Sequence, residues 1–177
     1  MTRVSLIDED HHPELSELIE GIRGARRGRL INVYKLLLHD PALAEAWFAL
    51  NNAVRWKTRL DGRLRELVII RIGVLCKAPY ILRQHVPGLA LAEGLTIEEC
   101  EALRDGRDCA SFTPRERAVL DFTDTLTRDV CAGEEHFHAL RFFFDETRIV
   151  ELSVLIGAYN MHARVMNAVE LDLEDPA

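Results

Sequence analysis

Hydrophobic residues recur every three or four positions along most of the chain, and charged or proline-containing segments separate the apolar stretches. This spacing places apolar side chains on one face of an α-helix. No stretch alternates between apolar and polar residues as a half-buried strand does, and no Asn-Gly or Asp-Gly hairpin joins two apolar runs. The pattern therefore predicts an all-α protein, a single-domain bundle of about seven to nine helices.

Capping residues predict where the helices begin. Asp40 before Pro41 and Asp61 before an apolar run are suitable N-caps. The segments "TIEE" from Thr96 and "TPRE" from Thr113 match the capping box, in which two side chains and two backbone N–H groups pair reciprocally. The expected helices cover residues 14–22, 27–40, 40–56, 61–76, 79–93, a stretch after 96, 113–130, 134–144 and 146–168.

The stretch "RELVIIRIGVLCKAPYILRQH", residues 65–85, contains an apolar run, a break at "KAP" and a final histidine. Proline is unfavourable inside a helix and favourable in its first turn. One helix is therefore expected to end near Cys76, and the next to run from Pro79 to about Glu93, where Gly94 closes it.

Glu66 and His85 stand near the two ends of this stretch. On one unbroken helix they would lie about 30 Å apart, but a turn at the break would fold the second helix against the first and bring them together. A carboxylate orients an imidazole and raises its pKa, which suits proton transfer near neutral pH. Tyr80 would supply a hydroxyl donor for a developing oxyanion. The alternative is structural: Glu66 pairs with Arg59, Arg63 or Arg65 on the surface, and His85 is half-exposed.

A short internal similarity links "ELVIIRIG" at 66–73 with "ELSVLIGA" at 151–158. Both segments put a Glu-Leu pair before an apolar run. The similarity predicts two comparable buried helices, either from an old duplication or by chance.

Composition limits the possible classes of protein. The 177 residues suit one domain, and 48% of them are hydrophobic, which is enough for a sizeable core. The net charge of −7 argues against a nucleic-acid partner, because phosphate binding needs a basic face. No apolar run is long enough to span a membrane, and the polar first residues do not resemble a signal peptide, so a cytoplasmic location is expected.

The cysteines and histidines show no metal-ligand spacing. The four cysteines, Cys76, Cys100, Cys109 and Cys131, form no Cys-x-x-Cys motif and are expected to be free thiols. His11 and His12 have no further ligand at metal spacing, and His136 and His138 would lie about 200° apart on a helix, which is unsuitable for one metal ion. Neither a metal nor a cofactor is predicted.

The segment "RELVIIRIGVLCKAPYILRQHVPGLALAEGLT" resembles the core motif of the carboxymuconolactone decarboxylase family, which includes alkylhydroperoxidase-D-like proteins. The resemblance extends over residues 28–174 and leaves 1–27 as an N-terminal extension with a short helix. It implies an alkylhydroperoxidase-D-like fold and assembly into a homo-oligomer (a dimer, trimer or hexamer). By position, Glu66, Tyr80 and His85 fall on the family's relay glutamate, tyrosine and histidine.

This chain departs from the family's peroxidase members at two positions. In those members a Cys-x-x-Cys pair precedes the histidine, and here Ala78 and Ile81 take its place. Thiol peroxidase chemistry needs a thiolate that attacks the peroxide and a second thiol that resolves the sulfenic acid. Cys76 is either a displaced nucleophile or a buried core residue. The departure argues against a disulfide-linked peroxidase.

The remaining activity that the resemblance implies is decarboxylation of a small carboxylated lactone, or an isomerisation of a related carbonyl compound. His85 would donate the proton, Glu66 would orient it, and Tyr80 would stabilise the oxyanion. Arg71 and Arg83 are candidates to bind the substrate carboxylate. His162 either reaches the same pocket or faces solvent.

Two other functions compete with this cofactor-free lyase or isomerase. One is a thiol-dependent, peroxidase-like antioxidant protein that uses Cys76 and an external thiol. The other is a non-catalytic oligomeric binding protein.

Overall fold

The computed structural model describes residues 2–26, 28–105 and 110–174, and within them it contains nine α-helices and no strand. The predicted all-α bundle is therefore confirmed. Three shorter helical turns accompany the nine helices, and Cys109 lies outside the described residues. The α-helices are α1 (Ser16–Ala25), α2 (Asn32–Leu37), α3 (Pro41–Trp56), α4 (Gly62–Leu75), α5 (Pro79–His85), α6 (Ile97–Asp105), α7 (Pro114–Arg128), α8 (Glu134–Arg141) and α9 (Glu146–Ala168).

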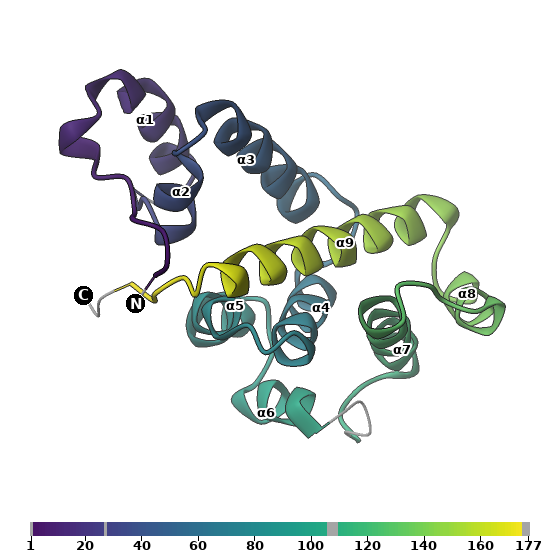
Figure 1. The fold of residues 1–177 in the computed structure, drawn as a ribbon. Helices are drawn as coiled ribbons and strands as arrows, with labels where there is room; N and C mark the ends of the chain where they lie inside the picture. Colours follow the sequence, from purple (N-terminus) through teal and green to yellow (C-terminus); the bar gives the residue numbers. More distant parts are fainter. Residues whose placement is uncertain (1, 27, 106–109, 175–177) are drawn as a thin grey trace.

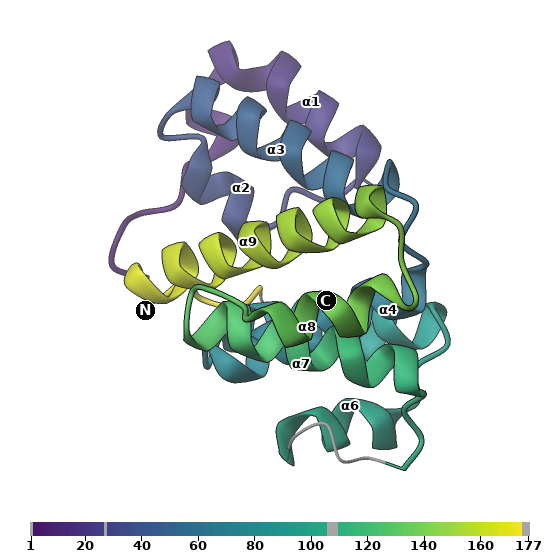
Figure 2. The same cartoon turned by 90° about the vertical axis from the view of Figure 1, so that its right-hand side faces the viewer.

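The long helix α9 runs between two groups of helices (Figures 1 and 2). Helices α1, α2 and α3 lie on one side of α9, and α4, α5, α7 and α8 lie on the other, with α6 at the outer edge. Helix α4 contacts α5, α6, α7 and α9. All residues from Leu64 to Gly73 are buried, because neighbours surround α4 and leave it no solvent-facing side.

The predicted N-caps form. Asp40 accepts a hydrogen bond from the backbone N–H of Leu43 at 3.1 Å, and Asp61 accepts one from that of Leu64 at 2.8 Å. Each side chain satisfies a first-turn N–H that has no partner within the helix. These two caps fix the beginnings of α3 and α4, which supply several residues of the site described below.

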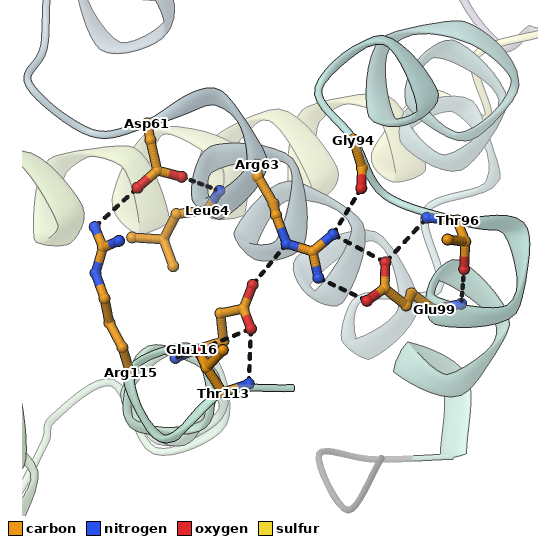
Figure 3. Close-up of polar contacts among 9 residues, drawn as sticks. All are labelled: Asp61, Arg63, Leu64, Gly94, Thr96, Glu99, Thr113, Arg115 and Glu116. Carbon is orange, nitrogen blue, oxygen red and sulfur yellow. Dashed lines mark hydrogen bonds and ion pairs between the residues drawn. The ribbon is translucent and has the colours of Figure 1, made fainter. Parts of the chain in front are cut away.

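The capping boxes of α6 and α7 also form, and Arg63 joins them (Figure 3). Its guanidinium donates to Glu116 at 2.7 Å and to both carboxylate oxygens of Glu99 at 2.6 and 2.9 Å. Thr96 and Thr113 complete the two boxes. Arg63 therefore fastens the beginning of α4 to the beginnings of α6 and α7, and it is not the partner of Glu66.

The chain reverses at the predicted break between α4 and α5. Lys77 has a left-handed backbone (φ 50°), and the N–H of Ala78 returns to the carbonyl of Gly73 at 2.8 Å. Helix α5 then packs against α4 so closely that a Cβ on Gly73 would lie 2.8 Å from a methyl carbon of Leu82. The turn brings the end of α5 beside the first turns of α4.

Several predicted helix ends are wrong. The expected helix over 79–93 is interrupted: α5 ends at His85, and Val86–Ala90 forms a π-helical turn that contains Pro87. Proline has no N–H to donate and crowds the preceding turn, which favours such an irregularity. Helices α2, α7 and α8 are also shorter than expected, and α1 extends to Ala25.

Candidate active site

A small cavity, here called the inner cavity, lies where α3, α5 and α9 meet. Its volume is about 30 Å³, which is enough to admit water and far below that of a typical small-molecule site. Apolar side chains such as Val33 and Met166 form part of the wall. The polar lining includes Asn51 and Arg55 from α3, Tyr80 and His85 from α5, and Tyr159 and His162 from α9.

The turn at Lys77 brings Glu66 and His85 together. Glu66 on α4 is completely buried, and its Oε2 lies 2.6 Å from Nδ1 of His85, which is 5% exposed. The second carboxylate oxygen, Oε1, lies 3.7 Å from a guanidinium nitrogen of Arg55 and 3.7 Å from one of Arg65. Arg65, one of the three alternative partners, does lie beside Glu66, but both side chains are buried, so the expected surface location of this ion pair is wrong.

The surroundings fix the charges of this pair. Burial raises the pKa of Glu66, but His85, Arg55 and Arg65 outweigh it, so the pKa is lowered and the carboxylate is ionised. Burial lowers the pKa of His85 and outweighs the opposing effect of Glu66. Glu66 therefore raises the pKa of His85 as expected, but the net shift is downward because burial is the larger effect. A neutral imidazole that donates from Nδ1 to Glu66 has its lone pair on Nε2.

Tyr159 of α9 lies on the other side of His85. Its hydroxyl is 3.5 Å from Nε2 of His85, and the two rings meet edge to face. Burial raises the pKa of Tyr159 to about 12, so the phenol is protonated at neutral pH. Tyr159 can therefore donate a hydrogen bond to Nε2 of His85. When a ligand is bound, the same hydroxyl can donate to the ligand.

Tyr80 lines the inner cavity as predicted, but its hydroxyl is engaged elsewhere. The oxygen accepts a hydrogen bond from the N–H of Val33 at 3.2 Å and donates to Oε1 of Glu174 at 2.5 Å. Burial, followed by Glu174, raises the pKa of Tyr80. The hydroxyl proton thus points at Glu174, and Tyr80 can act on a bound oxyanion only after that carboxylate leaves.

The two arginines proposed for the substrate carboxylate do not line the inner cavity. Arg71 is buried and donates two hydrogen bonds of 2.6 Å to Asp124, and a third to the carbonyl of Leu103. A buried guanidinium needs such a counter-charge, and here Asp124 already supplies it. Arg83 lies on the exposed side of α5.

His162 does reach the cavity. Its ring stacks on Trp47 with centroids 4.6 Å apart, and it packs beside Tyr159. Burial lowers the pKa of His162 to about 3, and the neighbouring His85 and arginines lower it in the same direction. Its Nε2 is buried without a hydrogen-bond partner in the part of the chain that the structure describes.

Sequence reasoning missed Asn51 and Arg55. Both line the cavity, and Arg55 is only 4% exposed. Oδ1 of Asn51 and the Nε and Nη2 atoms of Arg55 have no hydrogen-bond partner among the described residues. Unsatisfied buried donors and acceptors are rare, and they mark a place for water or a polar ligand. The available signal was the four-residue spacing of Trp47, Asn51 and Arg55, which puts all three on one face of α3.

A wider depression of about 330 Å³, here called the outer groove, adjoins the inner cavity and shares Arg26, Arg55 and Gln84 with it. Arg29 and Trp56 also line the groove, and no carboxylate does so among the described residues. Three guanidinium groups thus surround the approach in a chain of net charge −7. The positive electrostatic potential of these groups favours the approach of a small anion.

Cys76 lies in a different hollow, with Arg128, Arg164 and Asn167. Its sulfur is 3.7 Å from Oδ1 of Asn160, and burial raises its thiol pKa. Since the thiolate is the reactive species, this environment does not activate Cys76. Ala78 and Ile81, at the positions of the peroxidase cysteine pair, are buried apolar residues.

Within residues 2–26, 28–105 and 110–174, no three His, Cys, Asp or Glu side chains are grouped to hold a metal ion. No helix in these ranges is long and apolar enough to cross a membrane.

Comparison with known proteins supports the resemblance. Residues 41–125, which include Glu66, Tyr80 and His85, match the carboxymuconolactone decarboxylase family. This helical core therefore carries the sequence pattern of that family. The uncharacterized protein YdfG of Bacillus subtilis (strain 168) is 26% identical over 115 residues, which cover 64% of this chain and 78% of YdfG.

Solved structures extend the fold beyond the family match. A peroxidase-related protein from Ralstonia eutropha JMP134, described as an alkylhydroperoxidase AhpD core, aligns with a TM-score of 0.78 and 21% identity over 98% of this chain and 93% of its own. A variant of the debrominase Bmp8 in complex with 2,3,4-tribromopyrrole aligns with a TM-score of 0.80 and 19% identity, over 98% and 92% of the two chains. The alkylhydroperoxidase-D-like fold therefore covers nearly the whole chain.

Proposed function

We propose that the protein is a cofactor-free lyase or isomerase that acts on a small carbonyl compound bearing a carboxylate, such as a carboxylated lactone. The observation that supports this most is the buried Glu66–His85 pair. It leaves a neutral imidazole nitrogen beside a cavity in which buried polar atoms of Asn51, Arg55 and His162 have no hydrogen-bond partner in the described residues. Sites built for proton transfer combine a positioned base with fixed donors in this way.

In an isomerisation, Nε2 of His85 accepts a proton from the carbon next to the carbonyl, and the electron pair moves onto the carbonyl oxygen. Glu66 stabilises the imidazolium that forms, and Arg55 stabilises the oxyanion. The imidazolium then returns the proton to another carbon. Arg55 takes the role that the sequence had suggested for Tyr80, because Arg55 has buried N–H groups without a partner in the described chain.

In a decarboxylation, the electrons of the broken carbon–carbon bond move toward the carbonyl as CO₂ leaves, and Arg55 again faces the developing charge. His85 then passes a proton from water to the carbon, and the hydroxide that remains combines with the released CO₂ as bicarbonate. Both reactions use the same groups, so the site supports the class of proton-transfer chemistry and leaves the substrate to be found by assay.

The substrate must enter from the outer groove, since the inner cavity alone is far smaller than the sites that bind organic molecules. Arg26, Arg55 and Gln84 belong to both hollows and are the side chains whose movement would join them. An anionic substrate would be attracted by the arginines of the groove and would give the buried N–H groups of Arg55 a partner.

The direct test is the loss of ultraviolet absorbance of 4-carboxymuconolactone with the wild type, His85→Ala and His138→Ala. His138 is a matched control because its side chain is 72% exposed and lies on α8, away from the cavity. A rate that falls about 100-fold only in His85→Ala supports the proposal. Equal rates in all three would contradict it.

If the wild type leaves this lactone unchanged, hydrogen–deuterium exchange at carbon gives a test that does not require the natural substrate. A panel of small keto acids and lactones is incubated in D₂O and followed by proton NMR. His85-dependent exchange in any compound supports the proton-transfer proposal. Its absence across the panel would favour a non-catalytic binding protein.

A further inference from the structure

The carboxylate of Glu174 is bound by three donors from two helices. Its Oε1 accepts from the hydroxyl of Tyr80 at 2.5 Å and from the backbone N–H of Asn32 at 2.9 Å. Its Oε2 accepts from the side-chain amide of Gln84. Donors to both oxygens of one carboxylate form a complete anion-binding arrangement, in which charge assistance strengthens each bond.

The central donor is built into the protein interior. Tyr80 is 3% exposed, and its oxygen already accepts a hydrogen bond from Val33, so its single proton has one direction available. A buried hydroxyl without an acceptor is costly, and some acceptor must therefore occupy this position. Glu174 fills it in the present structure, but any small carboxylate or water could do so.

This group of donors borders the proposed active site. Tyr80 and Gln84 both line the inner cavity, Gln84 also lines the outer groove, and His85 directly follows Gln84 on α5. A carboxylate bound by Tyr80 and Gln84 would therefore lie at the edge of the space that His85 faces.

The segment that supplies Glu174 is fastened just before it. Asp172 exchanges hydrogen bonds of 2.6 to 2.8 Å with Thr2, and Arg3 pairs with Glu170 at 2.5 Å. Glu174 itself is partly exposed, unlike Tyr80. Its side chain can therefore swing away while the hydrogen bonds between Asp172 and Thr2 hold the rest of the segment in place, to which the exposed pair of Arg3 and Glu170 adds little.

We propose that Tyr80, Gln84 and the N–H of Asn32 form a carboxylate-binding subsite, that Glu174 occupies it as an internal competitor, and that the carboxylate of a small ligand displaces Glu174. Identifying that ligand with the substrate rests on the function proposed above. Displacement also frees Gln84 at the boundary between the groove and the cavity, and it directs the hydroxyl proton of Tyr80 onto the bound ligand.

The test measures binding of 2-furoate, a five-membered ring with one carboxylate, by NMR titration of the full chain. The signals followed are the side-chain amide of Gln84 and the backbone N–H of Asn32. The variants are Glu174→Ala and, as a matched control, Glu170→Ala, which removes one carboxylate from the same segment at a side chain 56% exposed. The neutral amide 2-furamide is the control ligand.

We expect Glu174→Ala to bind 2-furoate about fivefold or more tightly than the wild type and Glu170→Ala. In the latter two proteins Glu174 competes, so the apparent affinity is the intrinsic affinity multiplied by the fraction of subsites that Glu174 leaves free. 2-Furamide should show no such gain, and adding Tyr80→Phe to Glu174→Ala should abolish it. Equal affinities in wild type, Glu170→Ala and Glu174→Ala, or no binding by Glu174→Ala, would overturn the proposal.

This experiment is separate from the test of the proposed function. Binding is measured without turnover, and His85→Ala combined with Glu174→Ala should retain the gain in affinity. If that gain is found and no reaction depends on His85, the subsite stands and the catalytic proposal fails. If His85-dependent turnover is found and the gain is absent, only the subsite proposal fails.

Discussion

Nδ1 of His85 and Oε2 of Glu66 lie 2.6 Å apart in the interior, joined across the turn between α4 and α5. The carboxylate is ionised and the imidazole is neutral, because Arg55 and Arg65 stabilise the first and burial disfavours charge on the second. The contact therefore leaves His85 with one acceptor nitrogen, which is the state that a general base requires.

Replacing Glu66 by Gln tests this relationship. The amide cannot balance Arg55 and Arg65, so we expect the free energy of unfolding to fall by about 3 kcal/mol in urea denaturation. Loss of the nearby negative charge should lower the pKa of His85 further and move the acid limb of the pH–rate profile to lower pH. Glu135→Gln, at a side chain 77% exposed, is the control and should change stability by less than about 0.5 kcal/mol.

Arg55 and Arg65 form a matched pair for separating binding from stability. Each has a nitrogen 3.7 Å from Oε1 of Glu66, but only Arg55 lines the cavity, and only Arg65 also bonds Glu93. We expect Arg55→Met to weaken substrate affinity about tenfold or more and, because Arg65 still faces Glu66, to lower the free energy of unfolding less than Arg65→Met does. Arg65→Met, which also loses the bond to Glu93, should leave substrate affinity nearly unchanged. Equal effects of the two variants on affinity would argue against a ligand-binding role for Arg55.

His162 makes the protein sensitive to acid. Its pKa is about 3 in the folded state and near 6.5 in an unfolded chain, so the unfolded state binds the extra proton below pH 6.5. Folding stability is therefore complete above pH 6.5 and declines as the pH falls toward 3. From pH 7.5 to pH 5 the loss from His162 is about 2 kcal/mol.

The variant His162→Phe keeps a ring against Trp47 and cannot be protonated. In urea denaturation at the two pH values it should lose about 2 kcal/mol less than the wild type. His85, which also faces His162 and has a lowered pKa, should leave a remaining acid sensitivity. If His162→Phe loses as much free energy of unfolding as the wild type between pH 7.5 and pH 5, protonation of His162 is not the cause.

The sequence was sufficient for features set by local chemistry. The caps at Asp40 and Asp61 and the reversal before Pro79 follow from residue types within a few positions, and the structure contains all three. The proximity of Glu66 and His85 followed from the same reversal. Local signals, however, did not reveal the π-helical turn after His85.

The choice among arginines could not be made from sequence. Arg55 and Arg71 both lie in apolar helices, and what distinguishes them is Asp124, 53 residues beyond Arg71, which neutralises one and not the other. The direction of the pKa shift of His85 likewise depends on how completely distant helices bury it. Such differences arise from tertiary packing, which residue spacing does not encode.

The network around Arg63 should matter for stability and not for chemistry. Arg63 bonds Glu99, Glu116 and the carbonyl of Gly94, and it lies outside both the inner cavity and the outer groove. We expect Arg63→Met to lower the free energy of unfolding by about 2 kcal/mol, because two mostly buried carboxylates lose their shared cation. Arg83→Met, at an exposed position on α5, should leave it nearly unchanged. Loss of His85-dependent activity at full stability would contradict this assignment.

Cys76 decides between proton-transfer chemistry and a thiol-dependent peroxidase. Its raised thiol pKa and its place in a hollow apart from the inner cavity both oppose a role as nucleophile. We expect Cys76→Ser to leave His85-dependent activity within about twofold of the wild type, because the thiol does not face the cavity. In parallel, hydrogen peroxide consumption is measured with dithiothreitol as the external thiol. Consumption that disappears in Cys76→Ser and persists in the matched cysteine variant Cys131→Ser would establish the thiol enzyme instead, since Cys131 is exposed and equally free.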